Sequence, residues 1–283
     1  MRLALCNIEN MATQQAILEV IDNHKDTISL VITSDPYSRK NGGFIKQAYR
    51  NMRYRGYRFT EYLFVKMVLL SLIRPVLSLF GVDVLPSVEQ RCKELGIDHI
   101  HVKNVNTPEV EALLKSHQID LLTIYYFDQI LLPNIIEAPS KGVVNFHPAK
   151  LPNCRGLFPI MFSYLYNEQN FGISAHWVEN TDIDAGPIIA QQAIEVTHAT
   201  CLLDIDRQVS SHLPDLFECV IGKVVSGEAV AKAQTQSGSY FSYPDRTHLK
   251  LLNQTLKMID LRWVLNFMGV GKAKSQESKP IEK

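Results

Sequence analysis

The chain has 283 residues, enough to bury one large hydrophobic core or two modest ones. Lysine and arginine together number 29, as do aspartate and glutamate, so no net charge draws the whole protein to nucleic acid or anionic lipid. The five cysteines are scattered without a C-x-x-C pair, which argues against a cysteine-based zinc or redox motif and fits reduced thiols in a cytoplasmic protein.

The N-terminal apolar stretch is very short. It ends at Asn7, too early for the apolar core of a secretory signal, so we expect no export. Short apolar runs then alternate with helical patterns. Strands are predicted at residues 3–6, 28–33, 97–102, 120–126 and 143–147, and helices at 16–21 and 108–117. This alternation predicts an α/β fold with an open, mostly parallel, twisted sheet and helices on both faces.

Residues 37–85 form a basic and apolar insertion between the second and third predicted strands. From residue 39 to residue 74 the only acidic residue is Glu61, against many lysines and arginines. The later part, 62–82, is apolar but is interrupted by Lys66, Arg74 and Pro75, so its charge-free pieces are shorter than the ~20 residues of a membrane span.

Three interpretations of this insertion remain open. The first is a buried helical hairpin with solvated basic flanks. The second is an interfacial helix that touches anionic lipid, because basic and apolar residues together suit that setting. The third is contact with nucleic-acid phosphate, for which the sequence offers no strong evidence.

The later part of the chain is predicted to be helical. Helices are expected at 209–225 and around 249–267, with a Gly-Ser turn at 238–239. We therefore divide the chain into a catalytic domain at 1–205, a small C-terminal extension at 206–270, and a polar, disordered tail at 271–283.

Three polar residues stand out as candidates for chemistry. Asn145 and His147 lie two apart on a predicted strand and so point to the same face, at the carboxyl end where ligands bind in open α/β sheets. Asp184 follows in a loop that continues Ala185-Gly186. Acyl transfer to an amine needs an oxyanion donor, a proton acceptor and a proton donor, and an amide, an imidazole and a carboxylate supply all three.

The segments NFHPAKLPNCRG and GISAHWVENTDIDAGPIIAQ resemble the folate-dependent formyltransferase family, whose N-x-H pair falls on Asn145 and His147 and whose aspartate falls on Asp184. The resemblance implies a Rossmann-like fold and direct transfer of a formyl group from 10-formyltetrahydrofolate to an amine, with no metal. In this mechanism Asn145 and protonated His147 stabilise the oxyanion, and Asp184 relays a proton.

The resemblance also implies binding residues. The folate would be held by Phe127, Gln129, Leu131, Asn180 and Asp182, and the acceptor by Arg155 and His176. The chain has one residue more between His176 and Asp184 than its relatives, so Asp182 is the alternative catalytic carboxylate; Ala185-Gly186 favours Asp184.

The acceptor is left open by the sequence. The first loop, 6–10, lacks the glycine-rich sequence of the ribonucleotide transformylases, so a small amine such as an amino sugar or sugar nucleotide is favoured. The alternatives are a methionyl-tRNA formyltransferase-like enzyme, a hydrolase that releases formate from the same donor, and a non-catalytic folate- or membrane-binding module. His99 and His101 could ligate a metal, but no third ligand is evident nearby, which favours a structural role.

Overall fold

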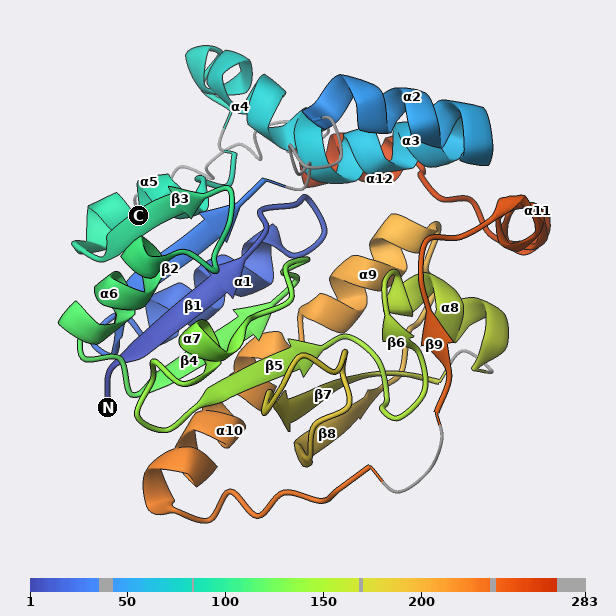
Figure 1. Cartoon of the computed structure of the whole chain (residues 1–283). Coiled ribbons are helices and arrows are strands. Elements are labelled where there is room, and N and C mark those ends of the chain that lie inside the picture. The colour runs from blue at the N-terminus through green and yellow to red at the C-terminus, as the bar shows by residue number, and fades with distance from the viewer. Residues whose placement is uncertain (36–42, 83, 168–169, 235–237, 269–283) are drawn as a thin grey trace, which may run out of the picture.

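A seven-stranded sheet forms the centre of the computed structural model, which describes residues 1–35, 43–82, 84–167, 170–234 and 238–268 (Figure 1). The strands lie in the order β3-β2-β1-β4-β5-β7-β8. Their bounds are β1 Leu3–Asn7, β2 Ile28–Ser34, β3 Asp98–Val102, β4 Leu121–Tyr125, β5 Val143–His147, β7 Phe171–Trp177 and β8 Ile188–Ile194. Strands β1 to β5 pair in parallel, whereas β7 and β8 are antiparallel. The predicted open, mostly parallel sheet is confirmed.

Helices cover both faces of this sheet because successive strand side chains point to opposite sides. In β1, Leu3 and Leu5 join one hydrophobic core, which includes residues of α1 and α10, whereas Ala4 and Cys6 join a second core with α6 and α7. The bounds are α1 Gln14–Asn23, α5 Val88–Leu95, α6 Pro108–Ser116, α7 Pro133–Ile136, α8 Pro159–Tyr166, α9 Leu202–Ser210 and α10 Leu213–Ser226.

The insertion is helical, and it is buried along one side only. Helix α2 (Gly43–Arg55) reverses at Gly56, whose φ of +89° suits glycine, into a continuous helix that spans Tyr57–Leu79. This long helix comprises α3 (Tyr57–Phe64), the π-helical turn η2 (Val65–Leu69) and α4 (Leu70–Leu79). The side of this helix that carries Phe59, Tyr62 and Leu70 is buried, but its outer side is exposed to solvent. The helical hairpin is therefore not buried as a whole, as the first interpretation expected. Residues 36–42 and 83 lie outside the described part.

In the C-terminal part the helices begin and end at other residues than expected, whereas the division into domains stays a prediction. The proposed domain limit at 205/206 falls inside α9. Helix α10 packs against α1 and β8, so the part of the chain that covers the sheet continues to Ser226. Pro214 in the first turn of α10 separates it from α9. The single helix expected at 249–267 is two helices, α11 (Arg246–Thr255) and α12 (Leu261–Phe267), because Asp260 caps the second. The tail predicted at 271–283 lies outside the described residues.

Candidate active site

A cavity of about 400 Å³ lies at the carboxyl ends of the central strands, within the roughly 300–1,000 Å³ of typical small-molecule sites. Ile8 follows β1, the loop 126–131 follows β4, and Asn145 to Pro148 end β5; all of them line this cavity. The strand order reverses between β1 and β4, which is where open α/β sheets bind ligands. The insertion closes another side through residues of α2, α3 and η2.

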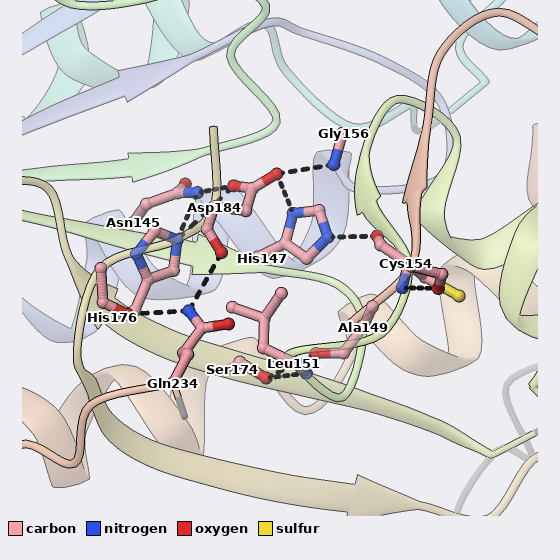
Figure 2. A network of polar contacts seen from close by, with 12 residues as sticks. Asn145, His147, Ala149, Leu151, Cys154, Gly156, Ser174, His176, Asp184 and Gln234 are labelled. Atoms are coloured by element: carbon pink, nitrogen blue, oxygen red, sulfur yellow. Dashed lines mark hydrogen bonds and ion pairs between the residues drawn. The ribbon is translucent and has the colours of Figure 1, made fainter. Parts of the chain in front are cut away.

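The structure brings together the amide, the imidazole and the carboxylate singled out from the sequence (Figure 2). The amide nitrogen of Asn145 donates to Oδ1 of Asp184 at 2.9 Å, and Nδ1 of His147 lies 3.4 Å from Oδ2 of the same carboxylate. Phe146, between them on β5, is buried and stacks on Phe217. The alternation of the strand therefore places Asn145 and His147 on the cavity side of the sheet.

His147 is fixed at both of its ring nitrogens. Nε2 donates to the carbonyl oxygen of Cys154 at 2.8 Å, while Nδ1 faces the carboxylate of Asp184. The side chain is buried, so neither contact is shared with bulk solvent. Because both neighbours are acceptors, a doubly protonated ring satisfies both of them.

The loop that carries Asp184 is held in a strained shape by its surroundings. Asp184 has a φ of +50°, a conformation that non-glycine residues rarely adopt. Two residues on, Gly186 packs so closely that an added Cβ would lie 1.8 Å from the carbonyl oxygen of Trp177. Gln234 donates to the carbonyl oxygens of Asp184 at 3.0 Å and of Gly186 at 2.8 Å. Strain of this kind persists only where neighbouring structure enforces it.

Asp184 is held ionised. Its burial opposes ionisation, but the neighbouring rings of His147 and His176 and the backbone N–H of Gly156 outweigh burial and lower the pKa of Asp184 to about 2 from 3.8. The Gly156 N–H donates to Oδ2 at 2.8 Å. The site therefore contains a carboxylate that is charged at neutral pH and stands ready to accept a proton or hold a cationic ring.

His176 lies next to Asn145 and is among the residues that line the cavity. On β7 it pairs in register with Asn145, and its Nε2 is 3.1 Å from the Asn145 amide nitrogen. Its Nδ1 is 2.9 Å from the carbonyl oxygen of Trp177, which can only accept. We therefore assign the proton to Nδ1, which leaves Nε2 to accept from Asn145. Only 2 % of His176 is exposed, so it is placed to orient Asn145.

The residues predicted to hold the folate all line the cavity. Phe127, Gln129 and Leu131 belong to the loop after β4, and Asn180 and Asp182 to the loop before Asp184. The side-chain oxygen of Gln129 already accepts from the Val105 N–H at 2.8 Å, so Gln129 also holds its own loop in place. Their binding roles remain predictions.

Of the two aspartates in the second loop, it is Asp184 that meets His147. Asp182 is exposed, and its backbone N–H is capped by the side-chain oxygen of Asn180 at 2.7 Å. Arg155, predicted to bind the acceptor, lies on the short strand β6 (Arg155–Gly156), which pairs with β9 (Tyr240–Phe241). Among the described residues that line the cavity, Gly156 is present and Arg155 is not, so the structure gives no support to the predicted contact.

A buried charged cluster at the cavity wall escaped the sequence analysis. Lys66 of η2 forms an ion pair with Asp206 of α9, and the hydroxyl of Tyr126 donates to the same carboxylate. The Lys66 ammonium also lies 4.6 Å from the centre of the Tyr126 ring, which adds a cation–π contact. One signal was available in the sequence, since Lys66 interrupts an otherwise apolar run. The partner residue could not be found because it lies 140 positions away.

The second candidate cluster, on β3, is structural in its contacts. His99 Nε2 and His101 Nδ1 lie 2.9 Å and 3.2 Å from the same hydroxyl oxygen of Thr33. Within the described ranges, no group of three or more histidine, cysteine, aspartate or glutamate side chains is placed to hold a metal ion.

Comparisons with known proteins agree on one family. Residues 87–218 match the family model described as formyl transferase. Methionyl-tRNA formyltransferase from Finegoldia magna is 30 % identical over 135 residues, which are 48 % of this chain and 43 % of that protein. The chain thus spans less than half the length of this curated relative.

Solved structures share the fold at lower identity. Phosphoribosylglycinamide formyltransferase from Bacillus halodurans has a TM-score of 0.53 at 20 % identity, with 80 % of this chain and 96 % of that chain covered. An N-formyltransferase from Helicobacter canadensis, in complex with folinic acid and dTDP-3-aminofucose, has a TM-score of 0.54 at 21 % identity, with 86 % and 71 % covered. At these identities the two structures show that the fold is shared.

Proposed function

We propose that this chain, which is similar to the formyl transferase family over residues 87–218, transfers a formyl group from 10-formyltetrahydrofolate to a primary amine of a small acceptor, an amino sugar or a sugar nucleotide. The observation that carries this proposal is the meeting of Asn145, His147 and Asp184 at the end of β5, inside a cavity large enough for a small molecule.

The cavity suits a reduced pterin as the donor. Its loop 126–131 presents apolar side chains together with the carboxyl group of Asp128. A reduced pterin is flat and rich in N–H donors, so apolar walls with a carboxylate between them match its chemistry. In the Helicobacter relative the bound folate is folinic acid, which supports the same class of donor here.

The chemistry follows from what each group can donate. The acceptor amine attacks the formyl carbon, and the carbonyl oxygen gains a negative charge that the Asn145 amide and a protonated His147 stabilise. The tetrahedral intermediate then collapses, the bond from carbon to the folate nitrogen breaks, and that nitrogen takes a proton. The attacking amine loses one proton in exchange, which the Asp184–His147 pair accepts and returns, so protons balance.

The Asn145 amide has an N–H group that can donate a hydrogen bond to the substrate. One N–H is held by Asp184, and the other points towards Nε2 of His176 at 3.1 Å. An oxyanion accepts a stronger, charge-assisted hydrogen bond than a neutral ring nitrogen does. The second contact is therefore the one that the reacting oxygen replaces.

The test is a pair of substitutions at Asn145. Asn145→Ala removes the donor, and Asn145→Asp keeps the shape while replacing the N–H groups by a carboxylate. Loss of one oxyanion donor costs roughly 10²–10³-fold in kcat, and both variants should show it in transfer of formyl to amino-sugar nucleotides followed by mass spectrometry. Asn167→Ala, at the end of α8 and away from the cavity lining, is the matched control. Full activity in Asn145→Ala with unchanged Tm would contradict the proposal.

A tRNA acceptor is a second candidate, because the curated relatives are methionyl-tRNA formyltransferases. Charged methionyl-tRNA in the same assay separates the two acceptor classes. Formate release in the absence of any amine would instead identify a hydrolase, in which water replaces the amine. If calorimetry shows no binding of the folate at all, the chain is a non-catalytic module and the proposed transfer is wrong.

A further inference from the structure

The outer side of α2 carries two parallel stripes of exposed side chains. Ile45, Tyr49 and Met52 are 82 %, 64 % and 50 % exposed, and their spacing of four and three residues places them on one face of the helix. Lys46, Arg50 and Arg53 are exposed one position further along. Each residue turns the helix by roughly 100°, so the basic stripe runs directly beside the apolar one.

Helix α4 continues the apolar surface. Leu72, Val76 and Leu79 repeat the same spacing and are 59 %, 52 % and 85 % exposed, and Phe80 at the end of the helix is 80 % exposed. Figure 1 shows α2, α3 and α4 as one layer above the sheet, with α4 projecting beyond it. Between residues 43 and 82 the sequence has a single acidic residue, Glu61.

We propose that this layer, which we call the α2–α4 face, docks on the surface of an anionic phospholipid bilayer. Apolar side chains of the two stripes would enter the boundary between headgroups and acyl chains, and the flanking lysine and arginine side chains would reach the lipid phosphates. Each basic residue near such a surface contributes about 1 kcal/mol. This inference goes beyond the proposed function and does not depend on it.

Other occupants fit the α2–α4 face less well. Nucleic acid would engage the basic stripe through phosphates, but it would leave Leu72, Val76 and Leu79 in water. A second copy of the chain would bring one basic stripe near another with almost no acidic residue to balance it. The surface of an anionic bilayer has charged headgroups above apolar acyl chains, so it matches the basic and the apolar stripes at once.

The long helix lies on the bilayer instead of crossing it. By length and composition the 23-residue helix Tyr57–Leu79 could span a membrane, because an 18-residue window within it has a mean hydropathy of 1.8 and is only 22 % buried. However, Phe59 and Tyr62 are fully buried in the protein core, and Lys66 is paired with Asp206. A spanning helix would have to extract all three, which costs far more than docking its open side.

Docking would bring the catalytic cavity close to the lipid surface. Gln47 and Asn51 of α2 and Leu63 of α3 line the cavity from the inner side of the same layer. The helix that would touch the lipid therefore also forms one wall of the cavity.

The experiment is vesicle flotation with the full chain at low salt. The probes are vesicles of phosphatidylcholine alone and of phosphatidylcholine mixed with phosphatidylglycerol. Wild type should float only with the anionic vesicles. Two variants test the two stripes: Leu72→Ser with Val76→Ser and Leu79→Ser, and Lys46→Gln with Arg50→Gln and Arg53→Gln. At about 1 kcal/mol per basic residue, the second variant should lose on the order of 100-fold in partition coefficient.

Matched controls carry the same chemical changes elsewhere on the surface. Val225→Ser with Val230→Ser removes exposed apolar side chains far along the chain, and Lys93→Gln, Lys103→Gln and Lys141→Gln remove the same number of exposed charges. Both controls should float like wild type. Unchanged Tm values would show that each variant remains folded.

A gain of signal completes the test. Val76→Trp should shift its fluorescence to the blue with anionic vesicles only. The proposal is overturned if wild type binds neither vesicle, if stripe variants and controls float equally, or if Val76→Trp shows no shift. It is also overturned if the basic variant loses RNA binding in a gel shift while vesicles never bind, or if light scattering shows that the α4 variant merely dissociates a dimer.

Discussion

Replacing Lys66 by methionine should destabilise the protein far more than replacing an ordinary lysine. Lys66 and Asp206 are both buried, with 5 % and 1 % of their side chains exposed, and Tyr126 donates to the same carboxylate. Burial favours the neutral amine, yet the charge of Asp206 and its hydrogen bond outweigh burial and raise the pKa of Lys66. Lys66→Met leaves the carboxylate buried with only a neutral partner.

The expected cost is large. Two opposite charges about 4 Å apart attract by about 4 kcal/mol at an effective dielectric constant of about 20, and breaking one side of a buried pair costs roughly 3–5 kcal/mol. For a chain of this size each kcal/mol lowers Tm by roughly 2–4 °C. Lys66→Met should therefore lower Tm by about 10 °C in scanning calorimetry.

The double variant Lys66→Met/Asp206→Asn tests whether the unpaired Asp206 carboxylate causes this loss of stability. If the damage comes from the stranded charge, removing that charge should restore much of the loss, and the two substitutions should be non-additive by about 2 kcal/mol or more. Lys103→Met, at an exposed lysine, is the control and should change little. Additive effects, or a Lys66→Met variant as stable as the control, would refute the view that this pair fastens the insertion to the core.

Three further predictions concern the loops of the cavity. Burial raises the pKa of Asp128 to about 6, so its stabilising contribution exists below pH 4 and is lost as pH rises through 6; Asp128→Asn should raise Tm at pH 7 and change it little at pH 4. Asp184, with its pKa lowered to about 2 despite burial, acts in the opposite sense: its contribution is present above pH 4 and fades as pH falls through 2, so Asp184→Asn should lose roughly 2 kcal/mol at pH 7 and flatten the acid limb of stability. Gly186→Ala must displace the carbonyl of Trp177, which should lower both transfer and Tm, whereas Gly222→Ala, a helical glycine with nothing within 4 Å of its added Cβ, should stabilise by about 0.5–1 kcal/mol; equal Tm changes in the two variants would contradict the close packing.

The parallel sheet and the core of the candidate site were within reach of sequence reasoning. Strands β1, β2 and β4 are short apolar runs, and the alternation of a strand directs Asn145 and His147 to one side without any knowledge of the rest of the fold. The resemblance to the formyltransferase family likewise followed from two contiguous segments, and residues 87–218, which include both segments, match the formyl transferase family model. These features are local, so neighbouring residues encode them.

Only the folded chain decided which distant groups meet. Asp184, and not Asp182, reaches His147 because Gly186 packs on Trp177 and Gln234 holds the loop from the C-terminal side. The pairing of Lys66 with Asp206, and the open outer side of the insertion, depend likewise on how helices far apart in sequence pack on the sheet. Periodicity determines which side of a helix is apolar, but whether that side finds a partner depends on long-range packing, which no local pattern records.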